Sequence, residues 1–308
     1  MKKHYAIGID IGGTSLRAAL VSDEGIVVKK VKLPSSDSIT ESLLKCVGEL
    51  MTVDVAGVGL GVAGVIDKEK GVVIESPNLP AIKGLQLAET VRARFGVPVF
   101  LENDALVAAL GEKWMGEGKA FRSFVLVTIG TDIGGSIFHG GHVMNVPAEI
   151  GHMSIVANGE KCSCGNYGCL ELYASARAML AYAISALENG AESALRQCCK
   201  GNIYKLSSED IYLTALDGDV LAREILREAG RYLGVGLSNI IHLFGPEAVI
   251  LAGGLTGAWN IYMQEAIREA SRRTFKRLFD AVKILPSSLG DNAGILGSSC
   301  LVFTCLYT

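Results

Sequence analysis

The sequence has no excess of positive charge. Among 308 residues, 29 Lys and Arg are balanced by 32 Asp and Glu, which gives a formal net charge of -3 and a pI near 6.0. A protein that holds a nucleic-acid backbone or an anionic bilayer needs a positive field. We therefore expect neither nucleic acid nor membrane among its partners.

Long hydrophobic runs are also missing. Asp10 interrupts the first apolar run after Lys2 and Lys3, so no secretory leader is indicated, and the apolar stretch 293–307 is too short to span a bilayer. The sequence thus predicts a cytoplasmic protein. Its eight cysteines fit that compartment as reduced thiols, because a chain of this length can bury a sufficient core without disulfides.

No Pro/Ser-rich linker or change of composition divides the chain. Its length nevertheless exceeds that of an ordinary single-core domain, so we expect two closely joined α/β domains around a cleft. The expected division is a small N-terminal domain of residues 1–118 with 290–308, and a large domain of residues 119–289. The content of 49% hydrophobic residues and 37 glycines fits buried strands joined by tight turns.

The hydrophobic pattern predicts alternating strands and helices. Expected strands are 5–11, 16–21, 26–33, 55–62, 97–101, 124–129, a short one ending at 138, 248–251 and 281–285. Expected helices follow a capping-box pattern at 38–41 and cover about 85–95, 171–188, 217–243, 259–275 and the segment from 292. The similar sequences at 10–15 and 132–137 indicate two related halves, although glycine-rich hairpins can look alike by chance.

Two glycine turns are candidate phosphate sites. In the segment Asp10 to Thr14, Gly12 and Gly13 let backbone N–H groups approach an anion, and Thr14 adds a hydroxyl donor. Asp10 could hold Mg²⁺ through water. An ordinary hairpin turn with a solvated Asp explains the same segment. Gly130-Thr131 is the second candidate.

A third glycine pair, Gly253-Gly254, follows the predicted strand 248–251 and suits packing against adenosine. Alone, it is weak evidence.

Asp104 follows the predicted strand 97–101, at the end of Glu102-Asn103-Asp104. A carboxylate at a strand end can remove the proton from a hydroxyl that attacks a phosphoryl group. It can instead cap the helix that follows. Asn103 and Asn78 can bond sugar hydroxyls, but asparagine is common in turns.

Three thiols, Cys162, Cys164 and Cys169, lie within eight residues, and His152 precedes them by ten. Three thiolates and one imidazole complete a tetrahedral structural zinc site. A purely buried set of thiols is disfavoured because the segment is polar and rich in glycine, and a redox role is disfavoured because it has no Cys-x-x-Cys pair.

The predicted metal site has a glutamate at each end. With one nitrogen of His152 on zinc, the other can bond a ligand. Glu149 and Glu171 can accept hydrogen bonds from sugar hydroxyls, although a single glutamate is often only solvated.

Taken together, these segments closely resemble the ROK (repressor, ORF, kinase) family across the whole chain. Residues 149–152 are similar to its ExGH motif, 162–171 to its CxCGxxGCxE motif, 10–14 to its first phosphate loop, 102–104 to its catalytic segment and 253–254 to its adenosine loop.

The resemblance implies an actin/hexokinase-like (ribonuclease H-like) fold and an ATP-dependent sugar kinase, usually a homodimer or homotetramer. It implies that Asp104 is the base for the 6-hydroxyl of a hexose, most simply glucose. The implied sugar ligands are Asn78, Asn103, Glu149, His152 and Glu171. The implied zinc ligands are His152, Cys162, Cys164 and Cys169. The implied nucleotide contacts are Asp10, Gly12, Gly13, Thr14, Thr131, Gly253 and Gly254, with ATP and Mg²⁺ as cofactors.

Other functions remain open. The same contacts serve kinases for N-acetylmannosamine, N-acetylglucosamine, allose or fructose. A sugar-responsive repressor is disfavoured because the phosphate loop begins as early as Asp10. Asp132 stands where the second phosphate loop usually has Gly, and an extra carboxylate repels ATP unless Mg²⁺ or a neighbour compensates. Residues 141–148 are also less glycine-rich than usual. An inactive sugar sensor is therefore the third interpretation.

Overall fold

The computed structural model describes residues 4–13, 15–35, 38–68, 70–76, 79–144, 146, 148–199 and 201–307. The chain forms two compact units. The first comprises Met1–Arg122, Ser136–Met144 and Ser287–Thr308, and the second comprises Ser123–Gly135 and Asn145–Pro286. The domain boundaries expected from the sequence stay a prediction. Across the described residues, no helix has both the length and the apolar composition needed to cross a bilayer.

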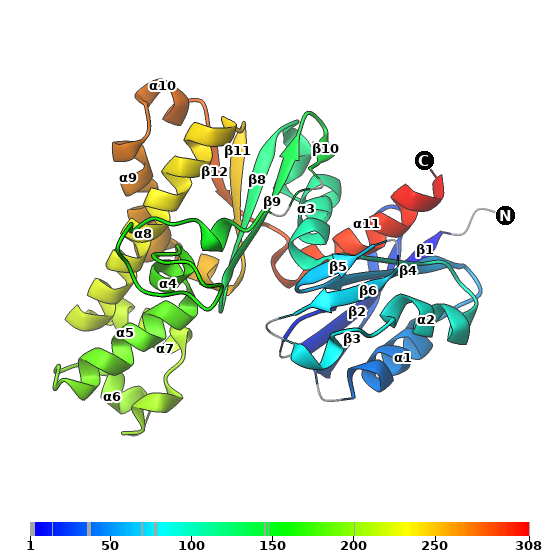
Figure 1. Cartoon of the computed structure of the whole chain (residues 1–308), viewed down its shortest axis with the longest axis horizontal. Coiled ribbons are helices and arrows are strands. Elements are labelled where there is room, and N and C mark those ends of the chain that lie inside the picture. The colour runs from blue at the N-terminus through cyan, green and yellow to red at the C-terminus, as the bar shows by residue number, and fades with distance from the viewer. Residues whose placement is uncertain are drawn as a thin grey trace. The chain divides into compact units, whose positions relative to one another are not determined.

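The first unit is built on a five-stranded sheet with strand order β3-β2-β1-β4-β7 (Figure 1). Its strands are β1 (Tyr5–Ile11), β2 (Ser15–Ser22), β3 (Val27–Pro34), β4 (Val55–Val62) and β7 (Val99–Asn103). β1, β2 and β3 pair antiparallel, whereas β4 and β7 run parallel to β1. A separate hairpin, which the hydrophobic pattern did not predict, is formed by β5 (Val65–Asp67) and β6 (Val72–Glu75).

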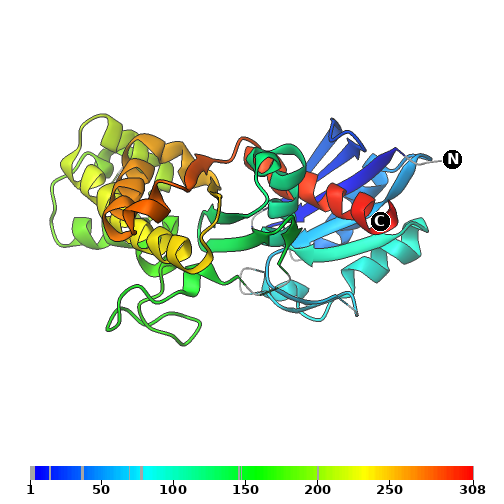
Figure 2. The same cartoon turned by 90° about the horizontal axis from the view of Figure 1, so that it is seen from above.

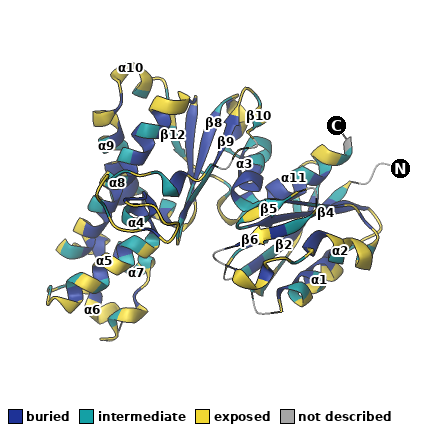
Figure 3. Cartoon of the chain, viewed as in Figure 1, coloured by how far each residue is buried: buried dark blue, intermediate teal, exposed yellow. Residues whose placement is uncertain are grey.

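Helices cover both faces of this sheet, as Figure 1 shows, and the view in Figure 2 looks down on the face that the C-terminal helix covers. They are α1 (Ile39–Leu50) and α2 (Leu87–Phe95) on one face, and α3 (Asp104–Met115) and α11 (Ala293–Tyr307) on the other. Side chains alternate along β1, so Ile7 and Ile9 join the core under α1 and α2, while Ala6 packs with Val302 of α11. The central strands β1 and β4 are accordingly buried on both faces, whereas the edge strand β3 is largely exposed (Figure 3).

The second sheet has the order β10-β9-β8-β11-β12. Its strands are β8 (Phe124–Ile129), β9 (Ile133–His139), β10 (His142–Val143), β11 (Ala248–Ala252) and β12 (Lys283–Pro286). Matched strand by strand, this order repeats that of the first sheet, which confirms two related halves. The similar sequences at 10–15 and 132–137 do not occupy equivalent positions in the two sheets, because Asp10 lies inside β1 whereas Asp132 lies beyond the end of β8.

Seven helices are described in the second unit: α4 (Glu171–Ala174), α5 (Ala176–Glu188), α6 (Leu195–Cys198), α7 (Ser208–Leu216), α8 (Val220–Phe244), α9 (Gln264–Arg273) and α10 (Lys276–Phe279). The long helix α8 packs against α5, α7 and α9. The single helix expected over 171–188 is divided at Ser175, whose backbone is extended and whose Oγ accepts the Ala178 N–H. This break positions the start of α5 beside the second glycine loop.

Candidate functional site

Asp10, the next-to-last residue of β1, is a partly buried carboxylate, with 22% of its side chain exposed. Arg17 Nη1 lies 3.9 Å from Asp10 Oδ2 and 3.0 Å from Asp291 Oδ1. The pKa of Asp10 is raised to about 6, chiefly because burial removes water from the carboxylate and also because Asp104 brings a second negative charge; Arg17 acts in the opposite direction. A cation beside this carboxylate would favour its charged form.

The start of α11 approaches the same carboxylate. A Cβ atom added at Gly294 would lie 2.9 Å from Asp10 Cγ, closer than any side chain permits. The N-terminal end of a helix carries partial positive charge from its unpaired N–H groups. Gly294 therefore lets a helix N-terminus come close to Asp10.

Asn103 ends β7 and caps α3. Its Oδ1 accepts the N–H groups of Ala105 at 3.0 Å and Leu106 at 3.2 Å, and its Nδ2 donates to the Gly64 carbonyl at 3.1 Å. Asp104 is the first residue of α3, with Oδ1 2.9 Å from the Ala105 nitrogen. The interpretation of Asp104 as the helix cap is therefore wrong, because Asn103 holds that position.

Asp10 and Asp104 lie at one edge of the first sheet. β1, β4 and β7 are neighbouring parallel strands, so their carboxyl ends meet at the same edge. The influence of Asp104 on the pKa of Asp10 shows that the two carboxylates are electrostatically coupled. In open α/β sheets, ligands generally bind at the carboxyl ends of the parallel strands.

Sequence reasoning missed the support behind this edge. Lys68 Nζ lies 2.5 Å from Glu102 Oε2, and Glu102 Oε1 accepts the Asn103 N–H at 2.8 Å. Ser76 Oγ also donates to the Ala63 carbonyl at 2.7 Å. The Lys68–Glu102 contact ties the hairpin β5–β6 to the end of β7, and the Ser76 bond ties it to the segment that follows β4. Lys68 and Glu102 are far apart in the sequence, so no local pattern indicated their pairing.

In the first glycine turn, both backbone polar groups of Gly12 already form hydrogen bonds within the protein. The Gly12 N–H donates to the Ser15 carbonyl at 3.1 Å, and Ser35 Oγ donates to the Gly12 carbonyl at 2.6 Å. The Gly12 N–H would have to leave this bond to contact a phosphate. Thr14 and Asn78, two of the predicted ligands, lie outside the described residues.

The second glycine turn joins β8 to β9 and is bonded to α5. The Gly130 N–H donates to the Asp132 carbonyl at 3.0 Å, and the Gly130 carbonyl accepts the Ala176 N–H at 2.9 Å. Thr131 lies in this turn. Arg177, the second residue of α5, forms an ion pair with Asp132. Arg177 was not singled out from the sequence, because 45 positions separate it from Asp132.

The third glycine turn packs on the second. Gly253 follows β11, has φ +98°, and would place a Cβ 2.4 Å from the carbonyl oxygen of Ile129, the last residue of β8. β8 and β11 are parallel neighbours. Gly253 and Gly254 are thus brought to the same sheet edge as Thr131, with Gly253 at a position that only glycine fits.

The four predicted metal ligands do come together. Candidate ligand atoms of His152, Cys162, Cys164 and Cys169 all lie within 4.8 Å of one another. Cys162 Sγ is 3.6 Å from His152 Nδ1, and Cys164 Sγ is 3.7 Å from Cys169 Sγ. Thiolates bound at about 2.3 Å in a tetrahedral zinc site lie about 3.8 Å apart. The donor set and its spacing therefore fit zinc.

A second group supports this cluster. Asn166 Nδ2 lies 3.4 Å from Cys169 Sγ and 3.2 Å from the His152 carbonyl, so it links two parts of the loop. The Cys162 N–H donates to the Asn166 carbonyl at 2.8 Å. Donors of this kind hold metal ligands in place and stabilise thiolate charge. Sequence reasoning gave Asn166 no role.

The two predicted glutamates differ in their surroundings. Glu171, the first residue of α4, is 8% exposed, with Oε1 3.4 Å from Cys162 Sγ and 3.6 Å from His152 Nδ1. Glu149 is exposed and precedes a short 3₁₀ turn, where its carbonyl accepts the His152 N–H at 3.0 Å. Both belong to the second unit with the metal cluster, whereas Asp10, Asn103 and Asp104 belong to the first.

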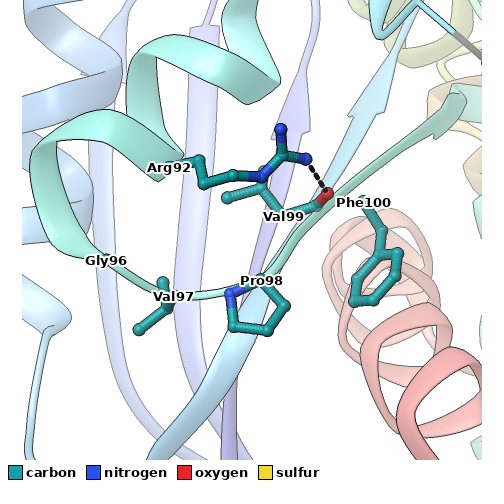
Figure 4. Close-up of a pocket in the computed structure, with 6 residues that line it drawn as sticks. All are labelled: Arg92, Gly96, Val97, Pro98, Val99 and Phe100. Carbon is teal, nitrogen blue, oxygen red and sulfur yellow. Dashed lines mark hydrogen bonds between the residues drawn. The ribbon is translucent and has the colours of Figure 1, made fainter.

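A shallow depression of about 460 Å³ lies elsewhere in the first unit (Figure 4). It is lined by Arg92, Gly96, Val97, Pro98, Val99 and Phe100. Arg92 Nη2 already donates to the Val99 carbonyl at 3.3 Å. The depression lies at the start of β7, whereas Asp104 follows the other end of that strand, so it is separate from the carboxylate edge.

Comparison with known proteins identifies the family. The model of the ROK family matches residues 6–304. A glucokinase of Streptomyces coelicolor is 33% identical over 96% of this chain and 96% of its own length. A xylose repressor of Bacillus subtilis is also 33% identical, and its match covers 98% of this chain and 77% of the repressor.

Solved structures agree. A ROK family glucokinase from Streptomyces griseus, crystallised with glucose and AMPPNP, has a TM-score of 0.86 and 32% identity, covering 96% of this chain and 98% of that one. This similarity confirms the predicted actin/hexokinase-like fold. With a family model that spans nearly the whole chain and relatives of this identity, the protein belongs to the ROK family.

Proposed function

We propose that this protein is a sugar kinase that transfers the terminal phosphoryl group of ATP to the 6-hydroxyl of a hexose, with glucose as the preferred substrate. The observation that carries the proposal is the division of roles at the end of β7. Asn103 caps α3, so the cap does not depend on Asp104, which lies at the sheet edge near Asp10. The similarity to glucokinases supports the choice of glucose.

Asp104 acts as the general base in this proposal. Its carboxylate accepts the proton of the sugar 6-hydroxyl as that oxygen forms a bond to the terminal phosphorus. The bond from phosphorus to the bridging oxygen of ADP breaks, so the products are sugar 6-phosphate, ADP and a proton on Asp104 that passes to water. Phosphoryl transfer depends mainly on positioning and charge stabilisation, so one well-placed carboxylate is sufficient for the proton step.

Asp10 is the proposed residue for Mg²⁺, held through water. A partly buried carboxylate with a raised pKa, near a second carboxylate and a helix N-terminus, fits a site completed by a cation and phosphate oxygens. When bound, Mg²⁺ neutralises charge on the phosphate groups. The proposed nucleotide contacts are Gly12, Gly13, Thr14, Thr131, Gly253 and Gly254.

The proposed sugar ligands are Asn78, Asn103, Glu149, His152 and Glu171. Asn103 can contribute little beyond one N–H of its amide, because Oδ1 serves the helix cap and Nδ2 already donates once. His152 Nδ1 faces the thiols, which leaves Nε2 for a sugar hydroxyl. Zinc on His152, Cys162, Cys164 and Cys169 would hold this histidine and the start of α4 in place. A homodimer or homotetramer remains a prediction.

A regulatory function is the second candidate. The xylose repressor that is 33% identical to this chain supports it, since the two align over 98% of this chain. Such a protein would bind its sugar without consuming ATP. Kinases for N-acetylmannosamine, N-acetylglucosamine, allose or fructose are the alternatives within the first class.

The test is a coupled ADP-release assay with Mg-ATP over glucose, fructose, allose, N-acetylglucosamine and N-acetylmannosamine, with calorimetry of sugar binding in parallel. We expect kcat/KM for glucose to exceed that for every other sugar by about tenfold. Preference for an N-acetyl sugar would overturn the substrate but keep the kinase. Sugar binding without ADP release from any sugar would establish the regulatory alternative.

A further inference from the structure

Asp132 adds a negative charge to the second glycine loop. Under the proposed function this loop meets the terminal phosphoryl group, which is itself negative. Like charges repel strongly where water is excluded. A loop that binds ATP therefore needs a positive group close to Asp132, and none of the loop residues Gly130, Thr131, Ile133 and Gly134 carries one.

Arg177 supplies that positive group. Its Nη2 forms an ion pair with Asp132 Oδ1, an oxygen that is shielded from solvent. The Asp132 side chain is 25% exposed, whereas the Arg177 side chain is 56% exposed. The carboxylate is thus the more buried partner, and the guanidinium is the partner that an arriving ligand can reach.

The backbone holds the pair together. The Gly130 carbonyl accepts the Ala176 N–H, and the Gly130 N–H donates to the Asp132 carbonyl. Ser175 Oγ caps α5 by accepting the Ala178 N–H at 3.2 Å. Because the loop and the first turn of α5 are joined through main-chain bonds, the ion pair does not depend on two mobile side chains meeting at a surface.

The position of Arg177 is unfavourable for a cation alone. Arg177 is the second residue of α5, where the helix dipole contributes partial positive charge. An arginine is stabilised there only by a nearby anion. Asp132 is that anion in the free protein, and a phosphoryl oxygen would be a second one in the nucleotide complex.

We propose that Arg177 is a specificity-determining residue for the phosphoryl donor, which neutralises Asp132 and donates further N–H groups to the terminal phosphoryl group. This inference rests on the proposed kinase function. A guanidinium presents several N–H donors in a planar fork, so it can bond a carboxylate and a phosphate together. The pair has no net charge, so the loop can accept phosphate despite Asp132. Lysine, with a single charged centre, would serve both anions less well.

The test compares Arg177→Ala, Arg177→Lys, Asp132→Gly and the double variant Asp132→Gly/Arg177→Ala. We expect Arg177→Ala to raise the KM for Mg-ATP at least about tenfold, and Arg177→Lys to raise it about threefold. The double variant should recover to within about threefold of the native value, because the uncompensated carboxylate is gone. The KM for sugar should stay within about twofold in all variants.

A binding measurement separates this role from a structural one. We expect Arg177→Ala to weaken a non-hydrolysable ATP analogue more than ADP, because ADP lacks the terminal phosphoryl group. Lys276→Ala is the matched control. It removes one positive charge from the same unit at an exposed pair with Asp280, and should leave nucleotide binding unchanged.

The outcomes separate the two proposals. An active native protein whose Arg177→Ala variant keeps its KM for Mg-ATP within twofold would overturn the role of Arg177 and leave the kinase intact. That role would also be overturned if the double variant is as impaired as Arg177→Ala, or if binding of the ATP analogue and of ADP weakens equally. A native protein that turns over no sugar would refute the kinase, and calorimetry with the ATP analogue would still decide whether the pair controls nucleotide binding.

Discussion

Asn103 and Asp104 are adjacent residues with different tasks. Asn103 accepts two backbone N–H groups of α3 and donates to the Gly64 carbonyl, so one side chain both starts the helix and holds the loop that follows β4. An asparagine suits this position because its amide offers acceptor and donor atoms together. A rigid Asn103 fixes the backbone from which Asp104 projects.

Replacing Asn103 tests this assignment. We expect Asn103→Ala to lower the free energy of unfolding by about 1 to 2 kcal/mol, because the cap of α3 is lost. Asn103→Ser keeps an oxygen that can cap the helix and loses the donor to the Gly64 carbonyl without adding a charge, so it should cost less than half as much. Urea unfolding of both variants measures the difference. Equal losses in the two variants would show that the cap is not what stabilises this turn.

For single residues, the sequence indicates which side chains are candidates for a function better than it indicates which side chains contact one another. The hypothesis that Asp104 is a carboxylate at a strand end could be formed from its position after a predicted strand. The choice between Asp104 and Asn103 as the cap could not, since both residues cap helices well. The neighbour that compensates Asp132 was also hidden, because Arg177 reaches it only through the junction of the loop with α5.

The helices α3 and α11, which cover one face of the first sheet, pack with their backbones very close together. A Cβ added at Gly297 would lie 1.5 Å from the Val107 carbonyl oxygen, and one added at Gly111 would lie 2.3 Å from the Ala293 carbonyl oxygen. Glycines on both helices therefore let the two backbones approach. This approach positions the start of α11 near Asp10 and the start of α3 at Asp104.

Adding one methyl group should separate these helices. We expect Gly297→Ala to lower the free energy of unfolding by about 3 kcal/mol or more, because the obstacle is backbone and cannot move aside as a side chain can. Gly257→Ala is the control, since its Cβ would meet no atom within 4 Å. Denaturant unfolding should show the control within about 0.5 kcal/mol of the native protein. A tolerated Gly297→Ala would contradict the close packing.

Main-chain hydrogen bonds, such as that from the Cys162 N–H to the Asn166 carbonyl, shape the cysteine loop, and its thiols are the proposed zinc ligands. We expect protein purified without chelators to contain about one zinc ion per chain, and chelation to lower the Tm. Cys164→Ser should lose the metal, whereas Cys198→Ser, a free and exposed cysteine outside the loop, should keep it. Elemental analysis and thermal unfolding provide the two readings. Native protein that contains no zinc yet has a Tm unaffected by chelators would refute the site.

Segments with a strong hydrophobic pattern were predicted well. β1, β4 and β8 have the bounds expected, and the helix 85–95 ends at Gly96 in a left-handed conformation. Short elements such as β5 and β6 were missed because a few residues carry no clear period. The capping-box pattern at Ser38 was wrong in detail: α1 begins after Ser38, but the Ser38 side chain makes no cap hydrogen bond.

For the whole molecule, the two sheets have matching strand orders, but the groups at the carboxyl ends of their strands differ. The first sheet presents the carboxylates Asp10 and Asp104, and the second presents the glycine turns at Thr131 and Gly253. A local sequence similarity indicated this repeat, but only the strand order revealed its register. The division into two units follows from long-range contacts that no local pattern contains.

The most direct test of the central claim is turnover by Asp104→Asn, which keeps the size of the side chain and removes the base. We expect calorimetry to find glucose bound within about twofold of the native affinity, while kcat for ADP release in the presence of Mg-ATP falls by about 10³-fold or more. A kcat within tenfold of the native value, with glucose binding intact, would contradict the role of Asp104 and with it the proposed mechanism.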